Sequence, residues 1–225
     1  MIPWVKIDTA RVPGTDAELR LMKRGAEFSI MLGTNELMNS RLSGSEAALA
    51  TLAVKKLEAN KTPHLLIGGL GMGFTLRAAL AVLKAGARIV VAELVPAVVT
   101  WGRGPMAEIF GGSLNDTRVS IQEVDVTEII RSSRSKFDAI LLDVDNGPEG
   151  LTQRANSWLY SSGGLSACAK ALRPKGVLAV WSASADKQFS DKLKKAGFKA
   201  EEVQVFAHGN KGTRHTIWIA EKLKG

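Results

Sequence analysis

The feature that most constrains the fold is a short apolar run that leads into three closely spaced glycines. The run Leu65–Ile67 is followed by Gly69, Gly71 and Gly73, and helix-forming residues continue over 75–84. This order predicts a buried strand, a tight turn and a helix. Glycine suits such a turn because a ligand can approach the backbone where a side chain would collide with it. The first N–H groups of the helix are also free to bind that ligand.

A carboxylate at the end of the next apolar run indicates what the turn binds. The run Ala87–Ala92 leads to Glu93, about twenty residues past the turn, where an acid can accept hydrogen bonds from both hydroxyls of a ribose. The dinucleotide fingerprint requires glycine at position 74, which is Phe74 here, and no Gly-Lys-Ser/Thr of a phosphate-binding loop follows. The sequence therefore predicts a nucleoside site, and a tight turn without a ligand is the alternative.

Strands and helices alternate from His64 onward, which is typical of a parallel sheet covered by helices on both faces. The pattern predicts strands at 65–67, 87–92, 118–124, 137–142 and 177–182, an antiparallel edge at 198–206 and 214–220, and helices from Pro96 and over 155–172 and 186–196. The predicted fold class is therefore α/β, Rossmann-like, with a mostly parallel seven-stranded sheet whose last strand is antiparallel.

Carboxylates follow three successive strands of this alternation, at Glu93, Asp125 and Asp143. The carboxyl ends of parallel strands form the edge at which open α/β sheets bind ligands. Taken singly, Asp125 or Asp143 is explained better as the N-cap of a helix than as a ligand-binding residue. Three such acids around one glycine turn indicate a binding site.

The chain before this alternation has a different character. Residues 1–42 predict a small β-rich segment with one or two hairpins, and residues 43–225 form the predicted nucleoside-binding domain. Ser43 and Glu46 match the spacing of a capping box, which predicts a helix that begins at Glu46 or just before it and ends near Glu58.

Composition limits which partners the protein can bind and where in the cell we expect it. The formal net charge of +8 and the sequence pI of about 9.7 admit a nucleic-acid partner, but no nucleic-acid-binding motif accompanies the charge. Cys168 lies in a helical pattern as a core residue, and the three separated histidines lack metal-ligand spacing, so we expect no metal. No apolar run reaches the roughly 20 residues of a membrane span, and the N-terminus is not a signal peptide, so we expect a cytoplasmic protein.

Four segments together resemble the spermidine synthase branch of the methyltransferase superfamily, the aminopropyltransferases. They are Gly69–Arg77, Ala92–Pro96, Arg118–Asp125 and Phe137–Pro148, and the resemblance extends over about residues 27–182. The resemblance implies the class I methyltransferase fold and a transferase. It implies S-adenosylmethionine, or its decarboxylated form, as cofactor and a small-molecule amine as acceptor, and it is compatible with a homodimer.

The resemblance also implies which residues bind the cofactor. By position, Glu93 holds the ribose, and Asp125 or its neighbour Val126 meets the adenine. The implied cofactor-binding set is completed by Gly69, Gly71, Gly73, Leu94 and Asp143.

The acid at the reacting centre corresponds to Asp143. Asp145 is a second candidate for this catalytic role, and Glu149 lies near it in sequence. A carboxylate there would accept a proton from the attacking amine or orient an amine that is already neutral.

Some positions depart from the family pattern. Met72 stands where the family has an acid that binds the amine end of the cofactor, and Gly44 and Ser45 stand where it has a Tyr-His pair, although Glu46 is retained. These departures favour methyl transfer to an amine or other small nucleophile, with aminopropyl transfer as the alternative. A non-catalytic nucleoside-binding module is the alternative from another class.

Overall fold

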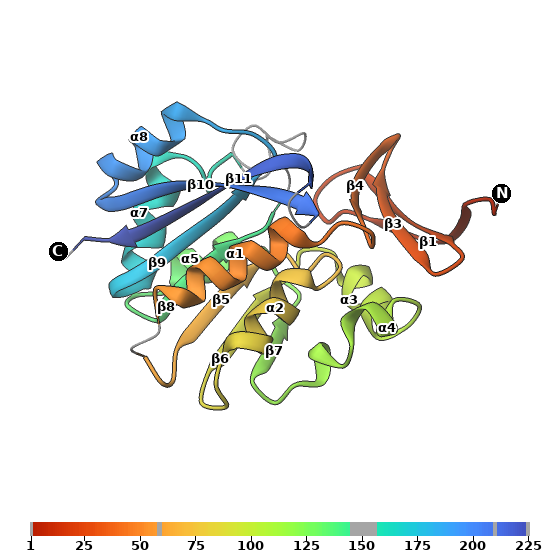
Figure 1. Cartoon of the computed structure of the whole chain (residues 1–225), viewed down its shortest axis with the longest axis horizontal. Helices are drawn as coiled ribbons and strands as arrows, with labels where there is room; N and C mark the ends of the chain where they lie inside the picture. Colours follow the sequence, from red (N-terminus) through yellow and green to blue (C-terminus); the bar gives the residue numbers. More distant parts are fainter. Residues whose placement is uncertain (1, 58–59, 145–156, 209–210, 224–225) are drawn as a thin grey trace.

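The computed structural model describes residues 2–57, 60–144, 157–208 and 211–223 and contains two β-sheets (Figure 1). The strands are β1 (Val5–Arg11), β2 (Glu18–Arg24), β3 (Glu27–Leu32), β4 (Asn35–Asn39), β5 (His64–Gly68), β6 (Arg88–Ala92), β7 (Val119–Gln122), β8 (Phe137–Leu142), β9 (Leu172–Ser182), β10 (Phe198–His208) and β11 (Lys211–Lys222). The helices are α1 (Gly44–Lys55), α2 (Phe74–Val82), α3 (Pro96–Arg103), α4 (Ala107–Phe110), α5 (Val126–Ser132), α7 (Ser162–Ala171) and α8 (Lys187–Lys195), with a short 3-10 helix, η1 (Ser113–Asn115).

The larger sheet has seven strands in the order β10-β11-β9-β8-β5-β6-β7. The five strands from β9 to β7 are parallel to one another, whereas β11 runs antiparallel to both β9 and β10. This arrangement confirms the predicted fold class, including the antiparallel last strand. Since β5 is the middle one of the five parallel strands, the glycine turn that follows it opens at the centre of the edge that these strands share.

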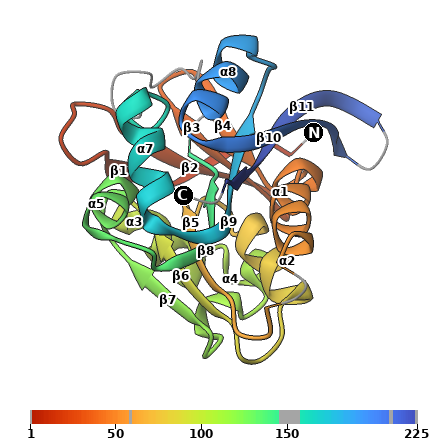
Figure 2. The same cartoon turned by 90° about the vertical axis from the view of Figure 1, so that its left-hand side faces the viewer.

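Helices cover both faces of this sheet, as Figure 2 shows with α1 and α2 on one side and α5 and α7 on the other. The alternating strand side chains divide the core accordingly. Leu65 and Ile67 of β5 pack in the cluster that contains α1 and α2, while Leu66 packs in the cluster that contains α5 and α7. Cys168 of α7 is fully buried in the second cluster, so its predicted place in the core is confirmed.

The N-terminal segment forms a four-stranded antiparallel sheet in the order β1-β2-β3-β4, which is more than the one or two hairpins expected. In β2, Leu19 and Leu21 alternate with more exposed residues and are buried in the core. The indole Nε1 of Trp101 on α3 donates a 2.7 Å hydrogen bond to Asp8, so the small sheet is attached to the larger unit.

Helix α1 begins at Gly44, close to the predicted start, but the predicted capping box is wrong. Ser43 occupies the N-cap position without a side-chain hydrogen bond to the helix. The carboxylate of Glu46 instead accepts a 2.7 Å hydrogen bond from the Ser45 hydroxyl. Glu46 therefore points away from the helix end, and its direction matters for the site described below.

Two further helix boundaries differ from the expectation. Helix α1 ends at Lys55 instead of near Glu58. Helix α7 begins at Ser162, where Ser161 accepts a hydrogen bond from the Gly164 N–H as an N-cap, whereas the predicted start at 155 lies outside the described residues. In the part of the chain that the structure describes, no helix is long and apolar enough to span a membrane.

Candidate functional site

The carboxyl ends of β5, β6 and β8 are joined by backbone hydrogen bonds at the glycine turn. The Gly69 N–H donates to the Ala92 carbonyl over 2.9 Å, and the Asp143 N–H donates to the Gly68 carbonyl over 2.9 Å. The ends of three strands are thus held side by side. The glycine turn, Glu93 and Asp143 therefore share one edge of the sheet, as the sequence predicted.

All three glycines of the turn adopt left-handed backbone conformations, with φ of +89° at Gly69, +51° at Gly71 and +77° at Gly73. A Cβ at Gly69 would collide with the Asp143 carbonyl, and one at Gly73 would collide with the Phe110 ring. At Gly71 the neighbour is the flexible end of Met38, whose sulfur would lie 2.9 Å from a Cβ. Gly69 and Gly73 are therefore needed for packing, while a side chain at Gly71 would displace only the flexible end of Met38.

Glu93 lies beneath the turn with both carboxylate oxygens hydrogen-bonded to the backbone. Oε2 accepts from the Leu70 N–H and Oε1 accepts from the Val95 N–H, each over 2.9 Å. Burial raises the pKa of Glu93, and these backbone N–H groups oppose the rise. Glu93 is thus held at the end of β6 by backbone N–H groups, and its contact with a ribose stays a prediction.

The other predicted cofactor residues lie along the same edge. Asp125 is the N-cap of α5, with its carboxylate accepting a 2.8 Å hydrogen bond from the Thr127 N–H. Val126 is buried, and its side chain closes against Gly68. Leu94 follows Glu93 and is half-buried. The contact that the structure shows for Asp125 is thus that of a helix N-cap. An adenine contact by Asp125 or Val126 stays a prediction.

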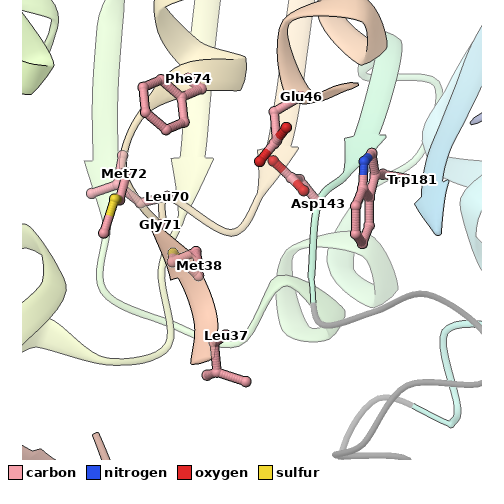
Figure 3. A pocket seen from close by; sticks show the side chains of 9 residues that line it. All are labelled: Leu37, Met38, Glu46, Leu70, Gly71, Met72, Phe74, Asp143 and Trp181. Carbon is pink, nitrogen blue, oxygen red and sulfur yellow. The ribbon is translucent and has the colours of Figure 1, made fainter. Parts of the chain in front are cut away.

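A cleft opens beside the glycine turn, between α1, β4 and the ends of β8 and β9 (Figure 3). Most of its wall is apolar or sulfur-containing, and two carboxylates project into it. The residues that line it are Leu37, Met38, Glu46, Leu70, Gly71, Met72, Phe74, Asp143 and Trp181. Glu93, Asp125 and Val126 are not part of this lining. Of the predicted site residues that the structure describes, the cleft therefore contains Gly71 and Asp143.

Glu46 and Asp143 point toward each other in this cleft, as Figure 3 shows. Thr75 Oγ1 donates a 2.6 Å hydrogen bond to Asp143 Oδ2 and also contacts the Glu46 carbonyl over 3.3 Å. Burial, followed by the negative charge of Glu46, raises the pKa of Asp143 to about 7, against the lowering effect of Thr75. Burial also raises the pKa of Glu46. One proton is thus readily held by the pair near neutral pH.

Such a pair suits an amine. An ammonium group donates up to three hydrogen bonds and compensates one negative charge of the facing carboxylates. An aromatic side chain such as Trp181 favours the adjacent methylenes or the cation itself. A carboxyl group with a pKa near 7 is also matched to accepting a proton at neutral pH. The arrangement can therefore bind an amine and deprotonate it.

Sequence reasoning missed several residues of the cleft. The capping-box pattern placed Glu46 at a helix end, although its retention from the family pattern was the signal that it belongs to the site. Trp181 lies near the end of β9, a strand whose carboxyl end lies on the same edge, so its position was a usable signal. Leu37 and Met38 come from the N-terminal sheet, and no motif marks them. Asp145 and Glu149, the other candidate acids, lie outside the described residues.

Among residues 2–57, 60–144, 157–208 and 211–223, no cluster of His, Cys, Asp and Glu could hold a metal ion. The chemistry that the described residues support is acid–base chemistry and positioning by carboxylates.

A central glycine turn, strand-end acids and the β11 reversal define the Rossmann-like fold of the class I methyltransferases. The model of the spermine/spermidine synthase domain family matches residues 47–205, and the chain belongs to that family. The predicted resemblance is therefore confirmed, as is the class of enzyme, a transferase.

Solved structures agree with this assignment of the fold. Spermidine synthase from Thermotoga maritima superposes with a TM-score of 0.73 at 17% identity, covering 98% of this chain and 73% of that chain. A spermidine synthase in complex with the transition state analogue AdoDATO has a TM-score of 0.72 at 18% identity, with the same shares covered. A probable spermidine synthase from Corynebacterium glutamicum has a TM-score of 0.65 at 14% identity, covering 97% and 79%. No curated protein sequence matches the chain.

Proposed function

We propose that this protein transfers an aminopropyl group from decarboxylated S-adenosylmethionine to a small amine, a reaction of polyamine biosynthesis. The observation that carries the proposal is the facing pair Glu46 and Asp143 beside the glycine turn. Membership of the spermine/spermidine synthase family supports the choice of donor and acceptor. The sequence motifs alone favour methyl transfer, and the family match instead supports the aminopropyl alternative.

The reaction is a displacement at carbon. The lone pair of the amine nitrogen forms the new C–N bond as the C–S bond of the sulfonium breaks, and sulfur takes the bonding electrons. The amine must lose one proton, and Asp143 accepts it, since its pKa near 7 allows it to be ionised before the reaction and protonated afterwards. The remaining contribution of the protein is to hold the two reactants close and aligned.

The described residues fit the nucleoside part of the donor. Backbone N–H groups of Leu70 and Val95 fix the carboxylate of Glu93 beside the glycine turn, and Gly71 of that turn lines the cleft. Under the proposal, Glu93 binds the ribose, the edge at Asp125 and Val126 contacts the adenine, and the alkyl end of the donor reaches the Glu46–Asp143 pair. When bound, the donor supplies the alkyl group and the neutral thioether that leaves.

Methyl transfer from S-adenosylmethionine is a second candidate, which one specific observation favours. Met72 is 2% exposed and lines the cleft at the position where the family has an acid for the amine end of the donor. A thioether cannot compensate the charge of that amine. S-adenosylmethionine has the same amino group, but the carboxylate next to that group carries the opposite charge, so its methionine end depends less on an acid at position 72.

The two candidates are separated by product mass. Purified protein is incubated with either donor and with putrescine or a panel of other diamines and monoamines. Aminopropyl transfer predicts a new amine that is heavier by one aminopropyl group and appears only with the decarboxylated donor. A product heavier by one methyl group, formed only with S-adenosylmethionine, would establish the second candidate. Binding of either donor without any product would favour a non-catalytic nucleoside-binding module.

A further inference from the structure

A chain of hydrogen bonds leaves the cleft from Glu46 and leads to a histidine on a distant strand. Ser45 Oγ lies 2.7 Å from Glu46 Oε2 and 2.9 Å from Nδ1 of His215. Ser45 is 1% exposed, whereas His215, on β11, is half-buried. The path therefore begins at a carboxylate that lines the cleft, passes through a buried hydroxyl, and ends at an imidazole nearer the surface.

The single proton of the hydroxyl allows two arrangements of this chain. When Glu46 is ionised, Ser45 donates to Oε2, so the His215 Nδ1 must carry a proton and donate to Ser45. When Glu46 is protonated, it can donate to Ser45, and Ser45 then donates to an unprotonated Nδ1. The second arrangement converts to the first when each proton moves along one hydrogen bond. One proton thereby passes from Glu46 to His215, and the hydroxyl is restored.

The surroundings of the imidazole suit a group that accepts a proton. Trp181 of β9 packs edge-on against the His215 ring, with centroids 4.8 Å apart, and Val205 of β10 pairs with His215 across the sheet. Neither residue titrates. Ser45 of α1 contacts the ring from a third side and connects it to Glu46, which is the ionisable group on this path. Burial lowers the pKa of His215, which keeps the ring largely neutral near pH 7.

We propose that Ser45 and His215 form a proton relay that carries the proton released by alkyl transfer out of the Glu46–Asp143 pair. The relay rests on the proposed function, because that reaction delivers a proton to Asp143 in each turnover. The proton exchanges between the facing carboxylates and leaves Glu46 for Ser45 Oγ as the serine proton moves to His215 Nδ1. The imidazolium then gives a proton to water, and the pair regains the charge needed for the next amine.

Kinetics of variants test the relay. His215→Gln keeps a group that can donate to Ser45 but cannot carry the proton, and Ser45→Ala breaks the path. Both should lower kcat by about tenfold, less than removal of the base itself, with little change in the KM of the amine. His215→Ala should regain turnover when imidazole is added. His64→Gln is the matched control, because His64 is also half-buried with its pKa lowered by burial but lies at the opposite end of β5.

A second measurement does not depend on turnover. The His215 ring is followed by NMR through a pH titration in the wild type, in Ser45→Ala and in Glu46→Gln. The relay predicts that the apparent pKa of His215 shifts in both variants, because ionised Glu46 favours a protonated Nδ1 through Ser45. Identical titrations in all three proteins, or kinetics of His215→Gln that match those of His64→Gln, would overturn the relay. A coupled titration in a wild type that transfers no alkyl group supports the hydrogen-bonded path and contradicts the proposed reaction.

Discussion

Thr75 Oγ1 donates a 2.6 Å hydrogen bond to Asp143 Oδ2, which links the helix after the glycine turn to the end of β8. The contact fixes one oxygen of Asp143, while Glu46 faces the same carboxylate from α1 (Figure 3). The hydrogen bond from Thr75 favours the ionised form of Asp143, whereas the negative charge of Glu46 favours the protonated form. The same geometry therefore determines both the reactivity of Asp143 and its effect on stability.

Replacement of Asp143 by asparagine should separate binding from chemistry. Asparagine keeps the shape and can still accept the hydrogen bond from Thr75, but it cannot take the proton of the amine. We expect kcat to fall about a hundredfold or more, with nearly unchanged affinity for the donor. Steady-state kinetics together with calorimetric titration of the donor measure the two effects. A parallel loss of affinity and turnover would instead make Asp143 a binding or structural residue.

Glu93→Gln should weaken donor binding and also destabilise the turn. The amide nitrogen of glutamine would face either the Leu70 N–H or the Val95 N–H, both of which now donate to the carboxylate. Leaving one buried N–H without an acceptor costs about 1 to 3 kcal/mol. Urea denaturation measures the loss of stability, and calorimetry measures the loss of affinity. Unchanged donor affinity in a folded variant would refute the ribose-binding role.

A pair of glycine substitutions distinguishes backbone strain from collision. Gly69 and Gly112 have similar φ values, +89° and +82°, but a Cβ at Gly112 meets no atom within 4 Å. Gly112→Ala should therefore cost only the left-handed conformation, about 1 to 2 kcal/mol. Gly69→Ala should cost more, because its Cβ meets the rigid backbone carbonyl of Asp143. Equal losses of unfolding free energy in the two variants would show that the glycine turn relaxes to accept the Cβ at position 69 without displacing Asp143.

The fold was predictable because its signals are local. A buried apolar run, three glycines and a strand-end acid lie within roughly thirty residues of one another, and parallel strands must present such acids at one edge. The extent of the N-terminal sheet was underestimated because the alternation in strands such as β2 is short, with Leu19 and Leu21 as the only buried residues of that strand. The capping box failed since the spacing of Ser43 and Glu46 is shared by helices whose glutamate points elsewhere.

The acceptor end of the site could not be read in the same way. It combines Met38 from the N-terminal sheet, Glu46 from α1 and Trp181 from β9, and only tertiary packing brings them together. His215 reaches Ser45 across 170 positions of sequence, through the antiparallel insertion of β11. Spacing along the chain carries no information about such a contact. The sequence thus specifies the nucleoside end of the site more fully than the acceptor end.

The last prediction concerns the pH dependence of stability. The pKa of Asp143 is about 7 in the folded protein, against 3.8 as the ordinary value, so the folded state holds a proton that the unfolded state releases. This contribution to stability is present below about pH 4 and is lost as pH rises through 7. The amide introduced by Asp143→Asn does not titrate, so the Tm of the variant should rise relative to that of the wild type across this window and level off above it. For a chain of this length, each kcal/mol of difference shifts Tm by about 2 to 4 °C. Calorimetric scans of both proteins from about pH 4 to about pH 8 measure the difference, and parallel Tm curves would mean that Asp143 is already ionised well below pH 7.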